Sequence, residues 1–244
     1  MIIDLTLADL TVPVFRNKLN IKEEKRGRFM KIGIIGATGK AGQDVFKEAV
    51  KRGHDVTAIV RNKEKAIQLF GEDANILEKD AFDLTREDLQ DFDVVVNAFA
   101  TEPQKAYLHV DLAAKLVAMF RETTKPRLFF ILGAGSLKTG EDGHLFVEDI
   151  RKTPGSEAWI AIPENQLKQL NFLRDVDNVN WVGVSPSAIF EPGENKGVVL
   201  GKDELLVAED GTSHTTTGTM AVAILDEIEN PQFHQERFTV RDKK

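Results

Sequence analysis

Residues 31–42 read KIGIIGATGKAG, an apolar run followed at once by three glycines at three-residue spacing. Glycine lets the backbone turn tightly and approach a ligand closely, and a helix beginning at residue 40 would direct free amides toward an anion. The first gap is one residue longer than in the usual dinucleotide fingerprint. We therefore predict a site for the diphosphate of a dinucleotide, formed by Gly36, Thr38, Gly39, Lys40, Ala41 and Gly42.

From residue 30 onward, short apolar runs alternate with helical stretches, the pattern of a doubly wound parallel sheet with helices on both faces. The runs are apolar at consecutive positions, as in Val94, Val95 and Val96, which strands buried on both faces require. The predicted strands are 31–35, 55–60, 75–79, 93–98, 127–132, 180–184 and 236–240. The predicted helices are 40–52, 63–70, 104–122, 163–175 and 217–229, with a short helix capped by Thr85. The fold class is thus α/β of the Rossmann type.

The end of the second strand distinguishes NAD from NADP, since an acidic residue there binds the ribose hydroxyls and an arginine accommodates a 2′-phosphate. This strand ends at Arg61, whereas Asp55 lies at its entry, the wrong end of the sheet. We therefore favour NADP, with NAD as the alternative. Asp80, after the third strand, is a candidate for the adenine amino group. Asn97, Ala98 and Phe99 end the fourth strand and are further cofactor candidates, although Asn97 could equally satisfy backbone groups.

Composition excludes several classes of protein. The chain has 244 residues, no cysteine and a formal charge of −7, and its longest apolar runs fall far short of a membrane helix. Disulfides, thiolate zinc sites and cysteine nucleophiles are therefore excluded, and general nucleic-acid binding is disfavoured. The five histidines share no metal-ligand spacing, so we expect no metal, and we place His109 on a helix surface. We expect a cytoplasmic protein with a small-molecule substrate; the oligomeric state is not readable from the sequence.

Two regions stand apart from the alternating pattern. Residues 1–29 lack the features of a signal peptide, and Met30 opens the first strand, so we expect 1–29 to be an extension upstream of the functional start. Residues 30–244 would then form one domain. Its long loops at 133–161 and 185–217 carry glycine and proline and follow the carboxyl ends of strands, where ligands bind in such sheets. We expect them to form a small substrate lobe.

The chain resembles the atypical short-chain dehydrogenase/reductases of the NmrA-like and NADH-flavin reductase type, including the biliverdin reductase B branch. The matching segments are GATGKAG at 36–42, VRN at 60–62, NAFA at 97–100, LGAGSL at 132–137, SPSAIFEPGE at 185–194 and FTV at 238–240. The resemblance implies a Rossmann fold, bound NAD(P) and, in the best-known members, hydride transfer to flavins or other small conjugated acceptors. It also implies that Gly133, Ala134 and Ser136 border the nicotinamide and the substrate, and that Pro186 follows the strand covering the ring.

One departure bears on the chemistry. Ordinary short-chain dehydrogenases use a Tyr-x-x-x-Lys pair for proton exchange, but Tyr107 is the single tyrosine here and Asp111 stands four positions later. Ketone or alcohol chemistry of the usual kind is therefore disfavoured. Hydride delivery to a flavin or quinone demands less, because the acceptor needs mainly to be stacked against the nicotinamide.

The leading hypothesis is therefore an NAD(P)H-dependent oxidoreductase that reduces a small planar acceptor such as a flavin or quinone. Ser136 would orient an acceptor carbonyl; the alternative is that its hydroxyl caps a backbone turn. Phe190 would form a wall of the pocket; the alternative is that it packs in the hydrophobic core. His214 is the histidine expected to reach the lobe. The alternatives are a non-catalytic NAD(P)-sensing regulatory protein and an epimerase acting on a nucleotide-linked sugar, the latter disfavoured because no acid/base residue is evident.

Overall fold

A computed structural model of the chain describes residues 29–243, and the expected extension at 1–29 lies outside them except for Phe29. The core is one eight-stranded sheet of order β10-β12-β8-β5-β4-β1-β2-β3, in which only the β10–β12 pair is antiparallel. The strands of this sheet are β1 (Lys31–Ile35), β2 (Asp55–Val60), β3 (Asn75–Glu78), β4 (Val94–Asn97), β5 (Thr123–Ile131), β8 (Val179–Pro186), β10 (Val198–Gly201) and β12 (Arg237–Asp242). The Rossmann-type α/β fold predicted from the sequence is confirmed.

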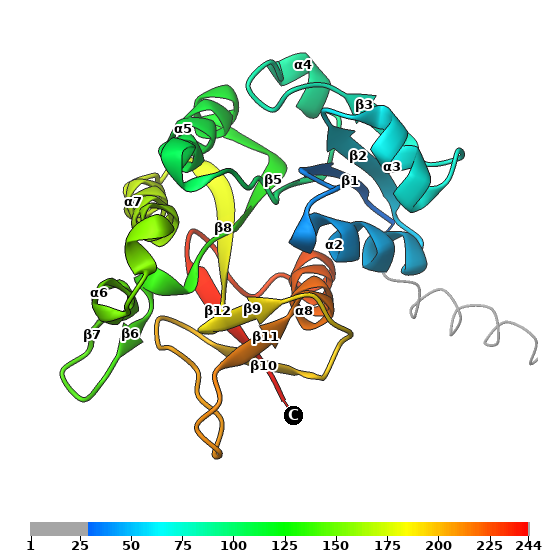
Figure 1. Cartoon of the computed structure of the whole chain (residues 1–244). Helices are drawn as coiled ribbons and strands as arrows, with labels where there is room; N and C mark the ends of the chain where they lie inside the picture. Colours follow the sequence, from blue (N-terminus) through cyan, green and yellow to red (C-terminus); the bar gives the residue numbers. More distant parts are fainter. Residues whose placement is uncertain (1–28, 244) are drawn as a thin grey trace, which may run out of the picture.

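Helices cover both faces of the sheet (Figure 1). Alternate residues of each strand point to opposite faces, so Val94 and Val96 join one core cluster and Val95 joins the other. One face is covered by α2 (Lys40–Lys51) packed against α8 (Thr217–Glu229), with α3 (Lys63–Phe70) beside them. The other is covered by α4 (Arg86–Leu89), α5 (Leu108–Phe120) and α7 (Ala161–Arg174).

Local capping explains where several helices begin. Asn62 accepts a hydrogen bond from the amide of Lys65 at the start of α3 (2.7 Å), and Thr216 does the same for Thr219 at the start of α8 (3.2 Å). At α4, the Asp88 carboxylate accepts from the Thr85 amide (2.7 Å), as the expected cap at Thr85 requires. In contrast, α2 follows Gly39 and has no side-chain cap, which leaves its first turn available to a ligand.

Every strand expected from the sequence is present, with ends that differ by up to four residues. The two long loop segments also contain elements that were not predicted: β6 (Lys138–Thr139), β7 (His144–Leu145), α6 (Phe146–Lys152), β9 (Ile189–Glu191), β10 and β11 (His214–Thr216). Strands β9 and β11 pair in parallel, and β6 and β7 pair antiparallel. These pairs are short and outside the main sheet, so no periodic hydrophobic pattern marks them in the sequence.

A buried ion pair joins the sheet to α8. The guanidinium of Arg127 on β5 lies 2.6 Å from the carboxylate of Glu227, and both side chains are less than a tenth exposed. Glu227 also accepts hydrogen bonds from the amides of Gln232 and Phe233. This carboxylate therefore neutralises a buried cation and satisfies two backbone groups in the turn that leads to β12.

We predict that Glu227→Gln lowers the free energy of unfolding by about 3 kcal/mol, because it leaves the buried guanidinium of Arg127 without a counter-charge. Chemical denaturation followed by circular dichroism measures the change. The matched control is Glu164→Gln, which removes the carboxylate of a largely exposed pair with Arg151 and should cost less than about 1 kcal/mol. Equal losses in the two variants would contradict the assignment.

Candidate functional site

The glycine loop lies between the end of β1 and the start of α2, and two of its glycines are required by close approach. Gly36 has a φ of +75°, and a Cβ there would meet the carbonyl oxygen of Ala98 at 2.7 Å. A Cβ on Gly42 would lie 2.3 Å from the carbonyl oxygen of Gly36. The first turn of α2 is thus held directly against the loop, so that its amides face the space beyond the carboxyl end of β1.

A first cavity of about 220 Å³ opens on one side of this loop. Three cationic side chains border it: Arg61 after β2, Lys65 on α3 and Lys79 after β3. Lys79 is paired with Asp88 at 2.6 Å, whereas Arg61 and Lys65 have no ion-pair partner among the described residues. The Asp80 side chain accepts from the Phe82 amide (2.9 Å) and also borders the cavity. The first cavity therefore offers two unpaired cations to a phosphate.

A second cavity of about 560 Å³ opens on the other side of the loop, where β4, β5 and β8 end. It is mainly apolar, with walls that include Phe146 on α6, Trp159 and Pro163. The two cavities share residues 98–100 as a common wall. The two cavities therefore adjoin at the carboxyl end of β4, on either side of the glycine loop.

Lys40 and Phe190 meet at the edge of the second cavity. The Lys40 Nζ donates to the carbonyl oxygen of Phe190 (3.3 Å) and lies 5.9 Å from the centre of its ring, within cation–π range. Lys40 begins α2 and Phe190 lies on β9. This contact connects the glycine loop to the loop segment that follows β8, on the far side of the cavity.

Most of the residues predicted from the sequence are brought together around the two cavities. The first is bordered by Gly36, Thr38, Gly39, Arg61, Asp80, Ala98 and Phe99. The second is bordered by Lys40, Ala41, Ala98, Phe99, Gly133, Ala134, Pro186 and Phe190. Gly42 packs against Gly36 behind the loop, and the Asn97 carboxamide accepts from the Phe99 amide (3.1 Å), so both shape the cavity walls from behind.

Ser136 does not border either cavity. Its hydroxyl donates to the carbonyl oxygen of Gly133 (3.2 Å) and accepts from the guanidinium of Arg237 (3.0 Å). The fully buried Arg237 side chain also donates to Ser185 and is paired with Asp203. The hydroxyl of Ser136 is therefore engaged in fixing the loop after β5 and is not directed at a ligand.

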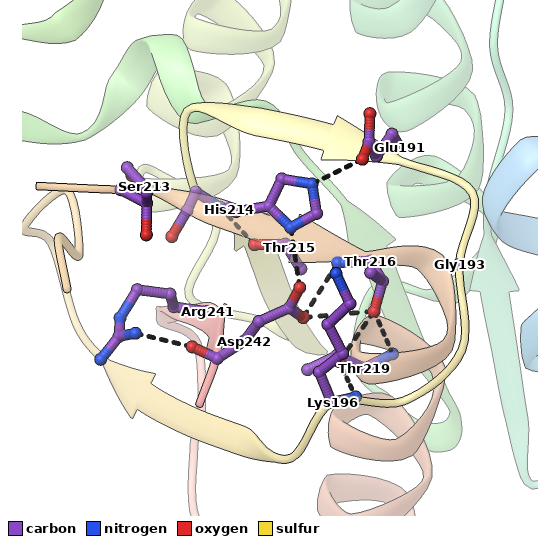
Figure 2. Close-up of polar contacts among 12 residues, drawn as sticks. Glu191, Gly193, Lys196, Ser213, His214, Thr215, Thr216, Thr219, Arg241 and Asp242 are labelled. Carbon is purple, nitrogen blue, oxygen red and sulfur yellow. Dashed lines mark hydrogen bonds and ion pairs between the residues drawn. The ribbon is translucent and has the colours of Figure 1, made fainter. Parts of the chain in front are cut away.

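His214 also borders neither of the two cavities. Its imidazole lies between two carboxylates, 2.8 Å from Asp242 and 2.9 Å from Glu191 (Figure 2). The hydrogen bond to Asp242, and then that to Glu191, raises the pKa of His214 above its ordinary value. Because Glu191 is on β9 next to Phe190, this histidine connects the wall of the second cavity to β12.

The expectation that His109 lies on a helix surface is wrong. The imidazole is 4% exposed, borders the second cavity and packs edge-on against the Phe99 ring with centroids 5.5 Å apart. Its Nε2 is buried without a hydrogen-bond partner, and burial lowers the pKa of His109 to about 4. A signal was present, because His109 starts the helical apolar series Leu112, Ala113, Leu116, Val117 and Phe120.

Tyr107 precedes α5 and is half exposed, and it borders neither cavity. Within residues 29–243, no three His, Asp or Glu side chains are grouped so that they could hold a metal ion. In the same range no helix is long and apolar enough to cross a membrane.

The residues present fit a nicotinamide dinucleotide. The glycine loop leaves space that side chains would fill, the uncapped first turn of α2 suits a diphosphate, and the two adjoining cavities suit the two halves of the molecule. A model of the NAD(P)H-binding family matches residues 36–231. The chain therefore belongs to this NAD(P)H-binding family, as the resemblance noted from the sequence implied.

Similar proteins cover nearly the same span. The uncharacterized protein YwnB of Bacillus subtilis (strain 168) is 43% identical over 213 residues, 86% of this chain and 98% of the relative. A crystal structure from Lactobacillus casei is 41% identical with a TM-score of 0.82, over 88% of this chain and all of that one. The crystal structure of SP1627 of Streptococcus pneumoniae TIGR4, described as a putative NADH-flavin reductase, is 32% identical with a TM-score of 0.78. The match covers 88% of this chain and 100% of that one.

We predict that His109→Phe reduces the acid sensitivity of folding. Because the pKa of His109 is about 4 in the folded protein and near 6.5 when unfolded, the unfolded chain binds more protons between these pH values. The contribution of the neutral imidazole to the free energy of unfolding is therefore fully present above pH 6.5, and it is lost as the pH falls toward 4. From pH 7 to pH 4, the wild type should lose about 3 kcal/mol more than the variant.

Denaturant titrations at a series of pH values measure this difference. The same replacement at the exposed His234 controls for the removal of an imidazole. If wild type and His109→Phe lose stability in parallel between pH 7 and pH 4, His109 is not held neutral by burial.

Proposed function

We propose that this protein is an NADPH-dependent reductase that transfers hydride to a small planar acceptor such as a flavin or a quinone. The observation that carries the proposal is the second cavity, an apolar, aromatic-lined space that shares residues 98–100 with the first. A nicotinamide reaching this space along the glycine loop would lie beside Gly133 and Pro186. The remaining volume suits a flat ring stacked against it.

The ionisable groups of the second cavity favour this type of reaction. Among the described residues, Lys40 and His109 are the ionisable side chains that border it, and neither a carboxylate nor a tyrosine does. His109 is neutral at pH 7 because its pKa is about 4. Reduction of a flavin or quinone suits such a site, since solvent can supply the proton and the walls need only orient the rings.

A bound dinucleotide supplies the hydride, and this chain supplies its position and surroundings. The first turn of α2 and Lys40 would bind the diphosphate, while Phe99, Trp159 and Pro163 exclude water from the ring that accepts the hydride. Phe190, held to Lys40, would close the side of the cavity nearest β9.

NADPH is favoured over NADH by the cations of the first cavity. Arg61 follows β2, where the adenosine ribose lies in proteins of this fold, and Lys65 lies on the next helix. Of the predicted residues that border this cavity, Asp80 is the acidic one. It follows β3, whereas the acidic residue that binds the ribose hydroxyls of NAD follows the second strand. A 2′-phosphate would therefore meet two cations that have no other ion-pair partner among the described residues.

The proposal is tested by following NADPH oxidation at 340 nm with FMN, riboflavin and soluble quinones as acceptors. We expect turnover with at least one of these acceptors. Tight NADPH binding without turnover on any of them would instead indicate the NAD(P)-sensing alternative. If neither NADPH nor NADH binds measurably, both the reductase function and the NAD(P)-sensing function are contradicted.

We predict that Arg61→Glu raises the dissociation constant of NADPH at least tenfold and changes that of NADH less than threefold, because only NADPH carries the 2′-phosphate. Fluorescence titration of the reduced cofactors measures both constants. Arg121→Glu is the matched control, because it makes the same charge reversal at an exposed position that borders neither cavity. Equal weakening of NADPH and NADH binding would refute the role of Arg61.

A further inference from the structure

The second cavity contains polar side chains that differ in whether they are already hydrogen-bonded. Lys40 donates to Phe190, the Thr153 hydroxyl to Asp149 (3.2 Å) and the Ser187 hydroxyl to Val240 (3.2 Å), each at a carbonyl oxygen. The side chains that border the cavity and have no hydrogen-bond partner among the described residues are Thr101, His109, Trp159 and Gln166. A polar group in such a space costs free energy unless a ligand or water satisfies it.

Gln166 is the member of this group placed best to meet a ligand. It lies on α7 and its Oε1 approaches the backbone of Gly133, at 2.2 Å from the position that a Cβ on Gly133 would take. Gly133 follows β5 at the carboxyl edge of the sheet, where ligands bind in doubly wound folds. The side chain is only partly buried, and neither amide atom is fully covered.

The other three unpaired groups are less suited to recognise a flat ring. The Nε2 of His109 is completely covered, the indole of Trp159 can only donate, and Thr101 offers a single rotating hydroxyl. The amide of Gln166 instead presents a donor and an acceptor side by side in one plane. Such an edge pairs with a ligand edge in which an N–H stands next to a carbonyl oxygen.

We propose that Gln166 is the residue that determines acceptor specificity, by forming two parallel hydrogen bonds with an imide edge of the acceptor. The inference rests on the proposed reductase function and deepens it. The isoalloxazine ring of a flavin has this edge, an N3–H between two carbonyl groups. A quinone offers carbonyl oxygens only and leaves the Gln166 carbonyl unpaired. The cavity should therefore prefer flavin-type rings to quinones of similar size.

The test compares three acceptors in NADPH oxidation: lumiflavin, N3-methyllumiflavin, which lacks the imide donor, and menadione. Each is measured with wild type, with Gln166→Leu and with the control Gln169→Leu. Gln169 is on the same helix and buried outside the cavity, so its replacement has the same chemistry without the proposed contact. The dissociation constant of NADPH is measured for each protein.

We expect Gln166→Leu to lower kcat/KM for lumiflavin about 10- to 100-fold and for menadione less than threefold, with NADPH binding unchanged. Methylation of N3 should lower kcat/KM of the wild type by a similar factor. It should lower kcat/KM of Gln166→Leu much less, because that variant already lacks the hydrogen bond to N3–H. Gln169→Leu should retain the wild-type preference among the acceptors.

Two results of these kinetic measurements would overturn the proposal. Equal losses for lumiflavin and menadione would give Gln166 a purely structural role. Weakened NADPH binding with an unchanged ratio between the acceptors would assign its amide to the cofactor carboxamide.

If the wild type reduces none of the acceptors, the proposed function fails. Gln166 is then tested by fluorescence binding of lumichrome, which carries the same imide edge. Tighter binding to wild type than to Gln166→Leu supports the contact, and equal binding excludes it.

Discussion

The close approach of α2 to the loop after β1 is the constraint on which the site depends. A Cβ at Gly42 would overlap the carbonyl oxygen of Gly36, and a Cβ at Gly36 would overlap that of Ala98. These two contacts fix the start of the helix against the ends of β1 and β4. Because no side chain caps the helix, its first amides remain available to an anion at this one point of the sheet edge.

The parallel sheet then arranges everything else around that point. Strands β4, β5 and β8 are neighbours and end at the same edge, so residues 98–100, Gly133 and Pro186 meet although they are far apart in the sequence. On the other side of β1, the neighbouring β2 and β3 bring Arg61 and Asp80 to the first cavity. The switch in strand order at β1 thus separates a polar cavity with cations from an apolar one, which matches the two different halves of a dinucleotide.

The fold could be predicted because its signals are local. Buried strands are continuous apolar runs and the glycine loop has its own spacing, so Gly36 and Arg61 could be assigned to the edge of the sheet where the first cavity lies. The position of Gly133 beside the second cavity was expected from the family resemblance alone. The roles of Ser136 and His214 could not be predicted, because their partners Arg237 and Asp242 lie 101 and 28 residues away. His109 was missed although its helical spacing with buried leucines was visible. Gln166 gives no signal in the sequence, since its importance depends on where α7 places it against Gly133.

A crystal structure of the full chain with NADPH would show where the dinucleotide binds. We expect the diphosphate to lie against the first turn of α2, within hydrogen-bond distance of backbone amides in residues 36–42, with the 2′-phosphate near Arg61 and the nicotinamide in the second cavity. Density for the dinucleotide elsewhere on the molecule, or a glycine loop that contacts no phosphate, would contradict this expectation.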